Sequence, residues 1–372
     1  MCTGIRLIAG DGTVVHARTM EFGSDIKSNV IVVPGGGYAR TGTAPKLKVP
    51  KGGQEELSED QKGATWTTKY ASVGANAFGL PIILDGLNEA GLAVGTFYFP
   101  TAAGYMPYSL ADQPNTIAPW ELGSWILDKW QDVAEVREHI DEIIVADVVL
   151  PEFGFVPPTH YVVHDASGNS IVIEYVGGKL NVHDNPLGVM SNSPTFDWHM
   201  TNLRNYVNFS VTNLPPLELK SNVPPLILKS ALPPVKLEGF GQGTGMLGLP
   251  GDLTPPSRFV RAVAFSQSIL PELIMNGTDT VLQAFHILNN FDIPKGVARD
   301  RELHEGEIAA DYTIWTSAND LKAKRFYFRT YENSQIRMVD LTKMMDLKAT
   351  GIVTIDMYDQ KEVIRPVTPM KG

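Results

Sequence analysis

The chain has 372 residues, of which 43% are hydrophobic and 19% are charged, and its formal net charge is -10. This composition is ordinary for a folded protein with a large core, and an acidic chain without a block of lysine and arginine argues against a nucleic-acid partner. The apolar runs are too short to span a bilayer, so we expect no membrane partner either.

The first predicted element is a hairpin of two strands, over residues 4–9 and 13–20. Both runs are β-prone, and the Asp-Gly pair between them is a strong signal for a tight turn. If Asp11 and Gly12 are the two loop residues, the register of the hairpin follows by counting outward from them.

This register places Cys2 opposite Glu21. Directly opposed residues on neighbouring strands have Cβ atoms about 5 Å apart, so the thiol and the carboxylate would lie within reach of each other. Strict alternation would point Arg18 to the other face of the hairpin. A bulge or the end of the strand could bring Arg18 back, and the sequence leaves both arrangements open.

The rest of the chain is predicted to contain strands in hairpin groups, with helices between the groups. Residues 34–65 are rich in Gly, Lys and Glu and predict long loops. Helices are predicted over 119–130, 132–143, 195–207, 257–269 and 279–291. Strands are predicted over 81–85, 91–99, 311–320, 324–331 and 336–341, with a hairpin over 160–176. This grouping favours an α+β fold with largely antiparallel sheets.

A proline-rich segment at about 213–240 interrupts this pattern. The motifs PPLELK, PPLILK and PPVKLE recur every nine residues, at 215–220, 224–229 and 233–238. Paired prolines exclude a continuous helix and a central strand, and three short copies are too few for a solenoid. We predict an extended arm, which could be a surface loop, a subunit contact or a rim over a pocket.

Two patterns that could indicate a cofactor or a metal lack the required context. The G-x-G-x-x-G match at 243–248 follows the proline-rich segment rather than a strand, and Pro250 and Gly251 stand where its helix should begin. Among the eight histidines, the nearest pair is His160 and His164, which has no local third ligand. We therefore expect no cofactor and no metal.

Cys2 is the only cysteine and stands directly behind Met1. A free cysteine is most often a small buried hydrophobe. Removal of Met1 would instead place a thiol and a free α-amino group on one residue, with ordinary pKa values of about 8.5 and about 7.7–8.0. The amine could then accept the proton of the thiol, so that one residue would supply both the nucleophile and its base.

Five separated segments resemble the choloylglycine hydrolase family of N-terminal-nucleophile hydrolases, which contains penicillin V acylases and conjugated bile acid hydrolases. They are MCTGIR, ARTMEF, GLNEAGLAVG, NPLGVMSNSPTFDWHMTNLRNY and GTGMLGLPGDLTPPSRFVRAVAF, in order from Cys2 to about residue 270. The resemblance implies one domain over residues 1–372, with a four-layer αββα sandwich of two stacked antiparallel sheets. It also implies amide hydrolysis through a cysteinyl thioester.

The resemblance assigns roles to charged residues near the nucleophile. Cys2 matches the nucleophile, Arg18 matches the buried arginine beside it, and Arg258 matches a second arginine close by. Glu21 stands where the family usually has aspartate, and its extra methylene keeps the charge but changes its reach. Without the family context, Arg18 and Glu21 could form a purely structural ion pair.

The resemblance also indicates how the substrate is held. Asn192 matches the oxyanion-hole asparagine, which acts with a backbone N–H near Tyr98, although an asparagine here could otherwise cap the following helix. Tyr98 falls where penicillin acylases carry tyrosine and bile-acid-specific members tend to carry asparagine. We expect Phe22, Trp66, Phe78 and Tyr98 to line an apolar pocket for the acyl group.

We therefore predict a hydrolase that cleaves a secondary amide, most similar to penicillin V acylase. Conjugated bile salt hydrolase and N-acyl homoserine lactone acylase are the alternatives within this class, and a non-catalytic amide-binding relative is the alternative outside it. The expected partners are a small amide substrate and further copies of the chain, in a tetramer or dimer. The expected location is cytoplasmic as written, or periplasmic if a leader was removed.

Overall fold

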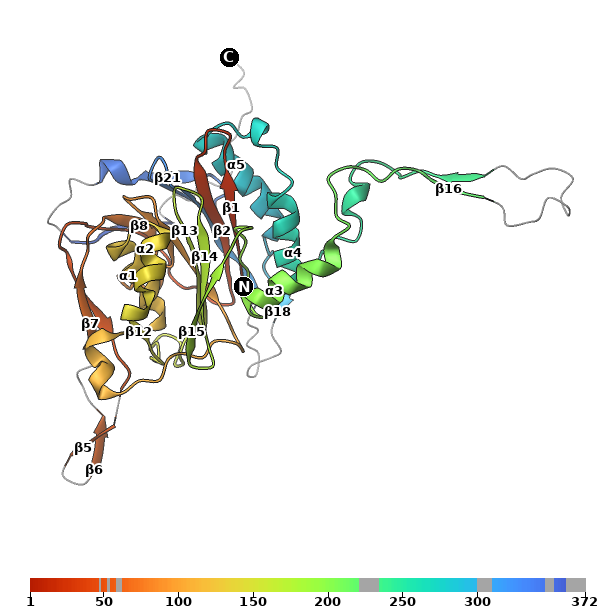
Figure 1. Cartoon of the computed structure of the whole chain (residues 1–372). Coiled ribbons are helices and arrows are strands. Elements are labelled where there is room, and N and C mark those ends of the chain that lie inside the picture. Colours follow the sequence, from red (N-terminus) through yellow and green to blue (C-terminus); the bar gives the residue numbers. More distant parts are fainter. Residues whose placement is uncertain are drawn as a thin grey trace, which may run out of the picture.

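Two β-sheets stack face to face at the centre of the molecule, and helices cover both outer sides (Figure 1). This is the four-layer α+β sandwich that the resemblance implies. The computed structural model describes residues 1–46, 48–51, 54–57, 62–220, 234–299, 310–344 and 351–358.

The first sheet joins the beginning of the chain to a late segment. Its main path runs in the order β1 (Cys2–Ile8), β2 (Val14–Phe22), β19 (Ala310–Asp320), β20 (Arg325–Thr330) and β21 (Arg337–Asp340), with antiparallel neighbours. The short strand β18 (Ala298–Arg299) adds to β19. The predicted late strands are thus confirmed, and β2 lies between β1 and β19.

The second sheet has eight strands and is antiparallel throughout. Its order is β15 (Lys179–Asp184), β14 (Ser170–Val176), β13 (Thr159–His164), β10 (Ala93–Tyr98), β9 (Asp85–Asn88), β8 (Ser72–Ala75), β3 (Val30–Val33) and β22 (Val353–Ile355). A strand was predicted at 81–85, but the observed strand β9 begins only at Asp85. The N–H of Ile83 donates to the side chain of Ser124 and not to a neighbouring strand.

The predicted helices are confirmed and form the two outer layers. α1 (Leu122–Lys129) and α2 (Val133–His139) cover the eight-stranded sheet, while α4 (Pro255–Ser266) and α5 (Gly277–Leu288) pack on the first sheet. α3 (Phe196–Asn202) contacts α4. Local capping explains several boundaries, since Asp132 and Asn276 accept backbone hydrogen bonds at the starts of α2 and α5. Among the described residues, none of the helices is both long enough and apolar enough to cross a membrane.

Short elements complete the two layers. The 3-10 turns are η1 (Leu110–Asn115), η2 (Pro119–Glu121), η3 (Ile140–Glu142), η4 (Leu203–Tyr206), η5 (Thr244–Met246), η6 (Pro271–Leu273), η7 (Asn289–Phe291) and η8 (Leu341–Lys343). Strands β11 (Thr116–Ile117) and β12 (Ile144–Val145) form a parallel pair; in the sequence, β11 precedes α1 and β12 follows α2.

Side-chain alternation along the eight-stranded sheet separates two parts of the core. Val162 of β13 and Val172 of β14 face the first sheet, whereas Tyr161 and Ile173 face α1 and α2. Both faces of these strands are buried, which explains their nearly continuous apolar sequence. The candidate site lies at the end of the inter-sheet core, where β1 begins.

The amino-terminal hairpin is confirmed, but its predicted register is wrong by one residue. The loop has three residues and not two, because it ends in Gly12, whose φ is +80° and whose N–H donates to the carbonyl of Ala9. A left-handed glycine at the end of a three-residue loop is a common hairpin closure. Cys2 therefore pairs with Met20 and not with Glu21.

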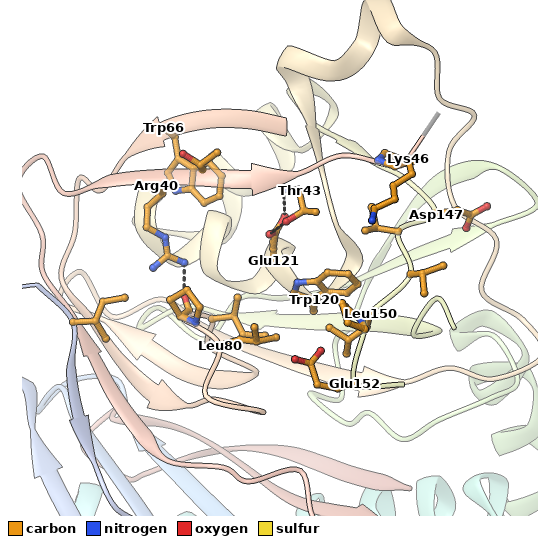
Figure 2. A pocket seen from close by; sticks show the side chains of 18 of the residues that line it. Arg40, Thr43, Lys46, Trp66, Leu80, Trp120, Glu121, Asp147, Leu150 and Glu152 are labelled. Carbon is orange, nitrogen blue, oxygen red and sulfur yellow. Dashed lines mark hydrogen bonds between the residues drawn. The ribbon is translucent and has the colours of Figure 1, made fainter. Parts of the chain in front are cut away.

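The long loops predicted for residues 34–65 are wrong in part. The segment forms two hairpins, β4 (Ala39–Thr43) with β7 (Lys62–Thr67) and β5 (Lys48–Lys51) with β6 (Gln54–Leu57). Exposed and buried positions alternate along β4, so the strand has one buried face despite its polar composition. Arg40, Thr43 and Trp66 come from the first hairpin and line one side of a pocket (Figure 2).

The proline-rich arm projects away from the two sheets (Figure 1). Where it is described, it is a two-stranded ribbon of β16 (Leu217–Leu219) and β17 (Val235–Leu237). Its described prolines precede the strands and do not interrupt them, as the geometry of proline requires. The second repeat, at 224–229, lies outside the described residues.

Candidate active site

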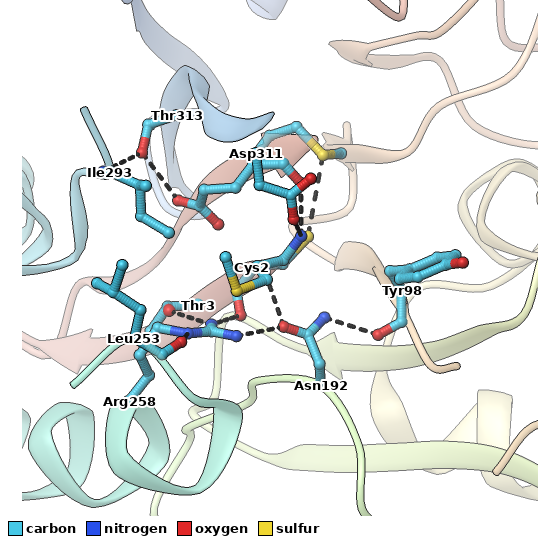
Figure 3. Close-up of polar contacts among 12 residues, drawn as sticks. Cys2, Thr3, Tyr98, Asn192, Leu253, Arg258, Ile293, Asp311 and Thr313 are labelled. Atoms are coloured by element: carbon cyan, nitrogen blue, oxygen red, sulfur yellow. Dashed lines mark hydrogen bonds and ion pairs between the residues drawn. The ribbon is translucent and has the colours of Figure 1, made fainter. Parts of the chain in front are cut away.

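Cys2 lies at the start of β1 and is buried, with 1% of its surface exposed. Its N–H donates to Oδ1 of Asn192 over 2.8 Å, and its Sγ lies 3.9 Å from Sδ of Met20 (Figure 3). The Met1 ammonium donates to the backbone carbonyl of Glu21 over 2.7 Å and lies 3.4 Å from a carboxylate oxygen of Asp311. The amino terminus is thus surrounded by acceptors.

Arg258, in the first turns of α4, orients the side chain of Asn192. The buried guanidinium donates to the carbonyl of Cys2, to Oγ1 of Thr3 over 2.8 Å and to Oδ1 of Asn192 over 2.6 Å. A guanidinium can only donate, so the amide oxygen of Asn192 must face it and Nδ2 must face away. Nδ2 donates one hydrogen to the carbonyl of Tyr98 over 2.6 Å. Its second hydrogen is left for another acceptor.

Arg18 shares the face of the hairpin that carries the Cys2 thiol, and the corrected register explains why. Because Cys2 pairs with Met20, alternation places Arg18, two residues earlier, on the same side. Its Nη2 lies 3.8 Å from Sδ of Met20, and Nη1 donates to the carbonyl of Thr96 over 2.5 Å. The guanidinium stacks 4.1 Å from the ring centre of Phe97. Neither a bulge nor the end of a strand is needed to bring Arg18 to this face.

Glu21 is fully buried, but its carboxylate does not reach Cys2. Thr313 Oγ1 donates to Oε1 of Glu21 over 3.2 Å, and Oε2 has no hydrogen-bond partner among the described residues. Burial raises the pKa of Glu21, against the opposing attraction of the amino terminus and of Arg258. The amino terminus therefore influences the Glu21 carboxyl group through its charge and not through a side-chain hydrogen bond.

A narrow apolar pocket of about 80 Å³ opens beside Cys2. Phe22, Phe78 and Tyr98 line it, as the sequence predicts, and so does Phe153, which the sequence analysis missed. The Phe153 ring stacks on Phe22 at 5.4 Å and meets Phe78 edge-on at 5.1 Å. The aromatic side chains thus form one packed group along the wall of the pocket. No charged residue belongs to the described lining.

A second and wider pocket of about 770 Å³ adjoins the first (Figure 2). The two share the lining residues Leu80, Ile82, Trp120 and Leu150, so they are direct neighbours. Trp66 lines this outer pocket and not the inner one, because β7, which carries it, belongs to a peripheral hairpin.

The polar groups of the outer pocket are linked to one buried carboxylate. Nε1 of Trp66 donates to Oδ2 of Asp128 over 2.9 Å, and Nε of Arg40 lies 3.6 Å from the same oxygen. Burial raises the pKa of Asp128 to about 6, although Arg40 and Trp66 oppose the shift. Burial also raises the pKa of Glu121, which accepts hydrogen bonds from Thr43.

The described residues offer no group of three or more His, Cys, Asp or Glu side chains that could hold a metal ion. The glycine-rich segment at 243–248 forms a loop around η5, and the next helix, α4, begins at Pro255. The dinucleotide fingerprint therefore lacks the helix that it needs.

Sequence comparison places the chain among known amide hydrolases. The sequence model of the choloylglycine hydrolase family, linear amide C–N hydrolases, matches residues 2–355. The bile salt hydrolase/transferase of Clostridium perfringens is 34% identical over 349 residues, which cover 92% of this chain and 93% of that protein. The penicillin V acylase of Pectobacterium atrosepticum is 26% identical over 348 residues, which cover 89% of this chain and 77% of that protein.

Comparison with solved structures gives the same family. The crystal structure of a variant of the conjugated bile acid hydrolase from Clostridium perfringens has a TM-score of 0.78 and 30% identity, and the match covers 99% of this chain and 100% of that chain. The penicillin V acylase of Agrobacterium tumefaciens shares the fold, with a TM-score of 0.69 and 24% identity over 95% of this chain and 91% of that chain. The chain therefore belongs to the choloylglycine hydrolase family of linear amide C–N hydrolases and has the N-terminal-nucleophile hydrolase fold.

Proposed function

We propose that the chain hydrolyses a secondary amide through Cys2, after removal of Met1, and that it prefers an aryl acyl group such as the phenoxyacetyl group of penicillin V. The observation that carries this proposal is the position of Cys2 between Asn192, which Arg258 orients, and an aromatic pocket. Membership of the hydrolase family supports catalysis over simple amide binding.

In this proposal Cys2 acts as its own base. The free α-amine accepts the proton of Sγ, and the thiolate attacks the carbonyl carbon of the amide. Arg18 and Arg258 are both fully buried near Cys2, and their positive charges favour the thiolate. Burial lowers the pKa of Arg258, but Glu21 and Cys2 oppose that shift and support its charged form.

The attack creates a negative oxygen that needs hydrogen-bond donors. We propose Asn192 as one donor, through the second hydrogen of Nδ2, and a backbone N–H near Tyr98 as the other. Removal of one oxyanion donor typically lowers the rate on the order of 10² to 10³. The carbon–nitrogen bond then breaks, and the protonated α-amine of Cys2 gives its proton to the leaving amine.

The second half of the reaction reverses these roles. The same α-amine takes a proton from water, and the resulting hydroxide attacks the thioester carbonyl. The carbon–sulfur bond breaks, the protonated α-amine gives its proton to the departing sulfur, and the carboxylic acid is released. No cofactor is needed for either half.

The inner pocket supports an aryl acyl group. A pocket of about 80 Å³ between the rings of Phe22, Phe78 and Phe153 suits a flat ring better than a bulky one. Offset and edge-on contacts between aromatic rings add about 0.5–1.5 kcal/mol beyond the area that they bury. Tyr98 supports the same assignment because it also lines the pocket.

A conjugated bile salt is the second candidate. The outer pocket, of about 770 Å³, shares four lining residues with the inner one and has room for a larger acyl group. The 34% identical relative from Clostridium perfringens carries the name bile salt hydrolase/transferase, which favours this candidate independently.

A hydrolysis panel at equal enzyme concentration tests both candidates. Penicillin V, penicillin G, glycocholate and a long-chain N-acyl homoserine lactone are compared by kcat/KM for amine release. We expect penicillin V to be preferred, and a preference for glycocholate would replace it with the second candidate. Mass spectrometry of the active protein should show that Met1 is absent, and full activity with Met1 attached would disprove the proposed base.

We further propose that the arm joins copies of the chain in a tetramer or dimer. Its register places Leu217, Leu219, Val235 and Leu237 on one face of the ribbon, and all four are exposed. An isolated two-stranded ribbon is marginally stable in water, so such a face favours a covered state. Sedimentation of the full chain and of a variant without residues 214–238 tests this, and a monomeric full chain would contradict it.

A further inference from the structure

The backbone that carries Asn192 is held by two imidazoles that the proposed reaction does not use. Nε2 of His160 lies 3.1 Å from the carbonyl oxygen of Ser191, and Nε2 of His199 lies 2.8 Å from the carbonyl oxygen of Asn192 itself. A carbonyl can only accept, so each Nε2 carries a hydrogen. Two consecutive carbonyls are thus fixed from the interior of the protein.

His160 is also tied to a buried carboxylate. It lies on β13, and its Nδ1 is 3.1 Å from Oε1 of Glu174 on the neighbouring strand β14. Both side chains are 1% exposed. The His160 ring stacks on Phe99, with 4.0 Å between ring centres and an angle of 11°. The ring therefore has a fixed plane, with one nitrogen toward Glu174 and the other toward Ser191.

The number of protons on this cluster follows from its acceptors. The backbone N–H of Phe196 donates to Oε1 of Glu174 over 3.0 Å, and Nε2 of His183 lies 3.6 Å from Oε2. Burial opposes ionisation of Glu174, but the hydrogen bonds and charges of His160 and His183 lower its pKa to about 2. A carboxylate and a carbonyl are both acceptors, so the geometry favours a hydrogen on each ring nitrogen of His160.

The neighbouring charges are compatible with this assignment. The titratable and charged groups around the pair are His183 on β15, His199 on α3 and Arg258 on α4. Burial lowers the pKa of His199 to about 4, so this ring is neutral at neutral pH. The contact with Glu174 raises the pKa of His183, which also lies near Asp197, so Glu174 faces the rings of both His160 and His183.

We infer that His160 is a positioning residue for the reaction: as an imidazolium it bridges the Glu174 carboxylate to the Ser191 carbonyl, and so it fixes the backbone from which Asn192 reaches the oxyanion. The inference rests on the proposed function, in which Asn192 donates to that oxygen. A displacement of a catalytic group by about 1 Å can lower a rate on the order of 10²-fold. Release of the Ser191 carbonyl would allow such a displacement.

Two substitutions of His160 separate its two hydrogen bonds. The amide nitrogen of His160→Gln lies about as far from the backbone as Nε2 and can still donate to Ser191, whereas that of His160→Asn matches Nδ1 and reaches only Glu174. We expect His160→Asn to lower kcat on the order of 10- to 100-fold with KM within about twofold, and His160→Gln to stay within about fivefold of the wild-type kcat. His183→Gln is the matched control, because it touches Glu174 but not Ser191.

Alkylation of Cys2 distinguishes positioning from general damage, because it does not use the oxyanion donors. We expect the alkylation rate of His160→Asn to match that of the wild type. Equal kcat values in a folded His160→Asn variant and the wild type would overturn the inference, and so would equal losses in the Gln and Asn variants.

A double-mutant cycle separates this inference from the proposed function. With Asn192→Ala as background, His160→Asn should cause no further loss of kcat, because the group that it positions is gone. If Asn192→Ala alone keeps full activity, the proposed function fails. If Asn192→Ala is impaired and the effects of the two substitutions simply multiply, only the present inference fails.

Nitrogen-15 NMR of the wild-type protein tests the proton count of His160 directly. At neutral pH both ring nitrogens of His160, identified by the signal that His160→Gln lacks, should have the shifts of a doubly protonated ring. A neutral ring in either tautomer would overturn the inference.

Discussion

The inner pocket beside Cys2 and its larger neighbour differ in size and in charge. The inner one is narrow and has no charged residue in its described lining, while the outer one is about ten times larger and includes Arg40, Lys46 and Glu121. Two buried carboxyl groups differ as well, since burial raises the pKa of Asp128, beside the outer pocket, to about 6, whereas the pKa of Glu174, beside His160, is lowered to about 2. Under the proposed function, the difference assigns the reaction to the inner region and the accommodation of a larger substrate to the outer one.

The strongest test of the inner region is Cys2→Ala. We expect a loss of kcat of at least about 10³-fold, because both the thiol and its attachment to the base are essential to the proposed reaction. The side chain is small, so the melting temperature should stay within a few degrees of the wild type. Turnover of any panel substrate at the wild-type rate would contradict the assignment of the nucleophile.

The next test is Asn192→Ala. Loss of the proposed oxyanion donor should lower kcat on the order of 10² to 10³, with a smaller effect on KM. Asn205→Ala is a matched control, because Asn205 is exposed and its side chain bonds only to Asn202 among the described contacts. Similar kinetics in both variants would mean that Asn192 caps or packs and does not catalyse.

The outer region should respond to pH through Asp128. Its pKa of about 6 lies above the ordinary value of 3.8, so the folded state binds this proton more tightly than the unfolded state. Stability is therefore lost as pH rises from about 4 to about 6, by about 3 kcal/mol for this one group. Urea unfolding at pH 4 and pH 7 should show that Asp128→Asn lacks this loss. An equal pH dependence in both proteins would disprove the shift.

The smallest expected effects sharpen the division between the pockets. Phe153→Ala should raise KM for penicillin V about tenfold, because an aromatic face of the inner pocket is removed. Trp66→Ala should raise KM for glycocholate about threefold and leave penicillin V unchanged, since Trp66 lies only in the outer pocket. The same response of both substrates to both variants would show that the two pockets act as one.

Much of the fold follows from local pattern, because the strands and helices around the site carry strong periodicity. The register of the first hairpin does not follow from local pattern. An Asp-Gly pair fits loops of two and of three residues, and only the conformation of Gly12 decides between them. That single residue determined whether Arg18 or Glu21 faces the thiol. The peripheral strand β4 was missed because its buried positions are small or polar.

The candidate site was found mainly through resemblance, and what resemblance does not name was missed. His160 was considered only as a metal ligand. Counting outward from the turn predicted at 166–169 would set it opposite Tyr175, whereas the observed register, with His164 opposite Ser170, sets it opposite Glu174. Phe153 was missed because it lies in an irregular loop where side-chain direction has no period.

The pairing of β2 with β19 has a consequence for biosynthesis. A ribosome releases the amino-terminal strands first, whereas the partner that flanks β2 follows only with residues 310–320. Asp311, which binds the amino terminus in the folded chain, is therefore made only after β1 and β2. Under the proposed function, the segment that carries the nucleophile is synthesised long before the strand that completes its surroundings.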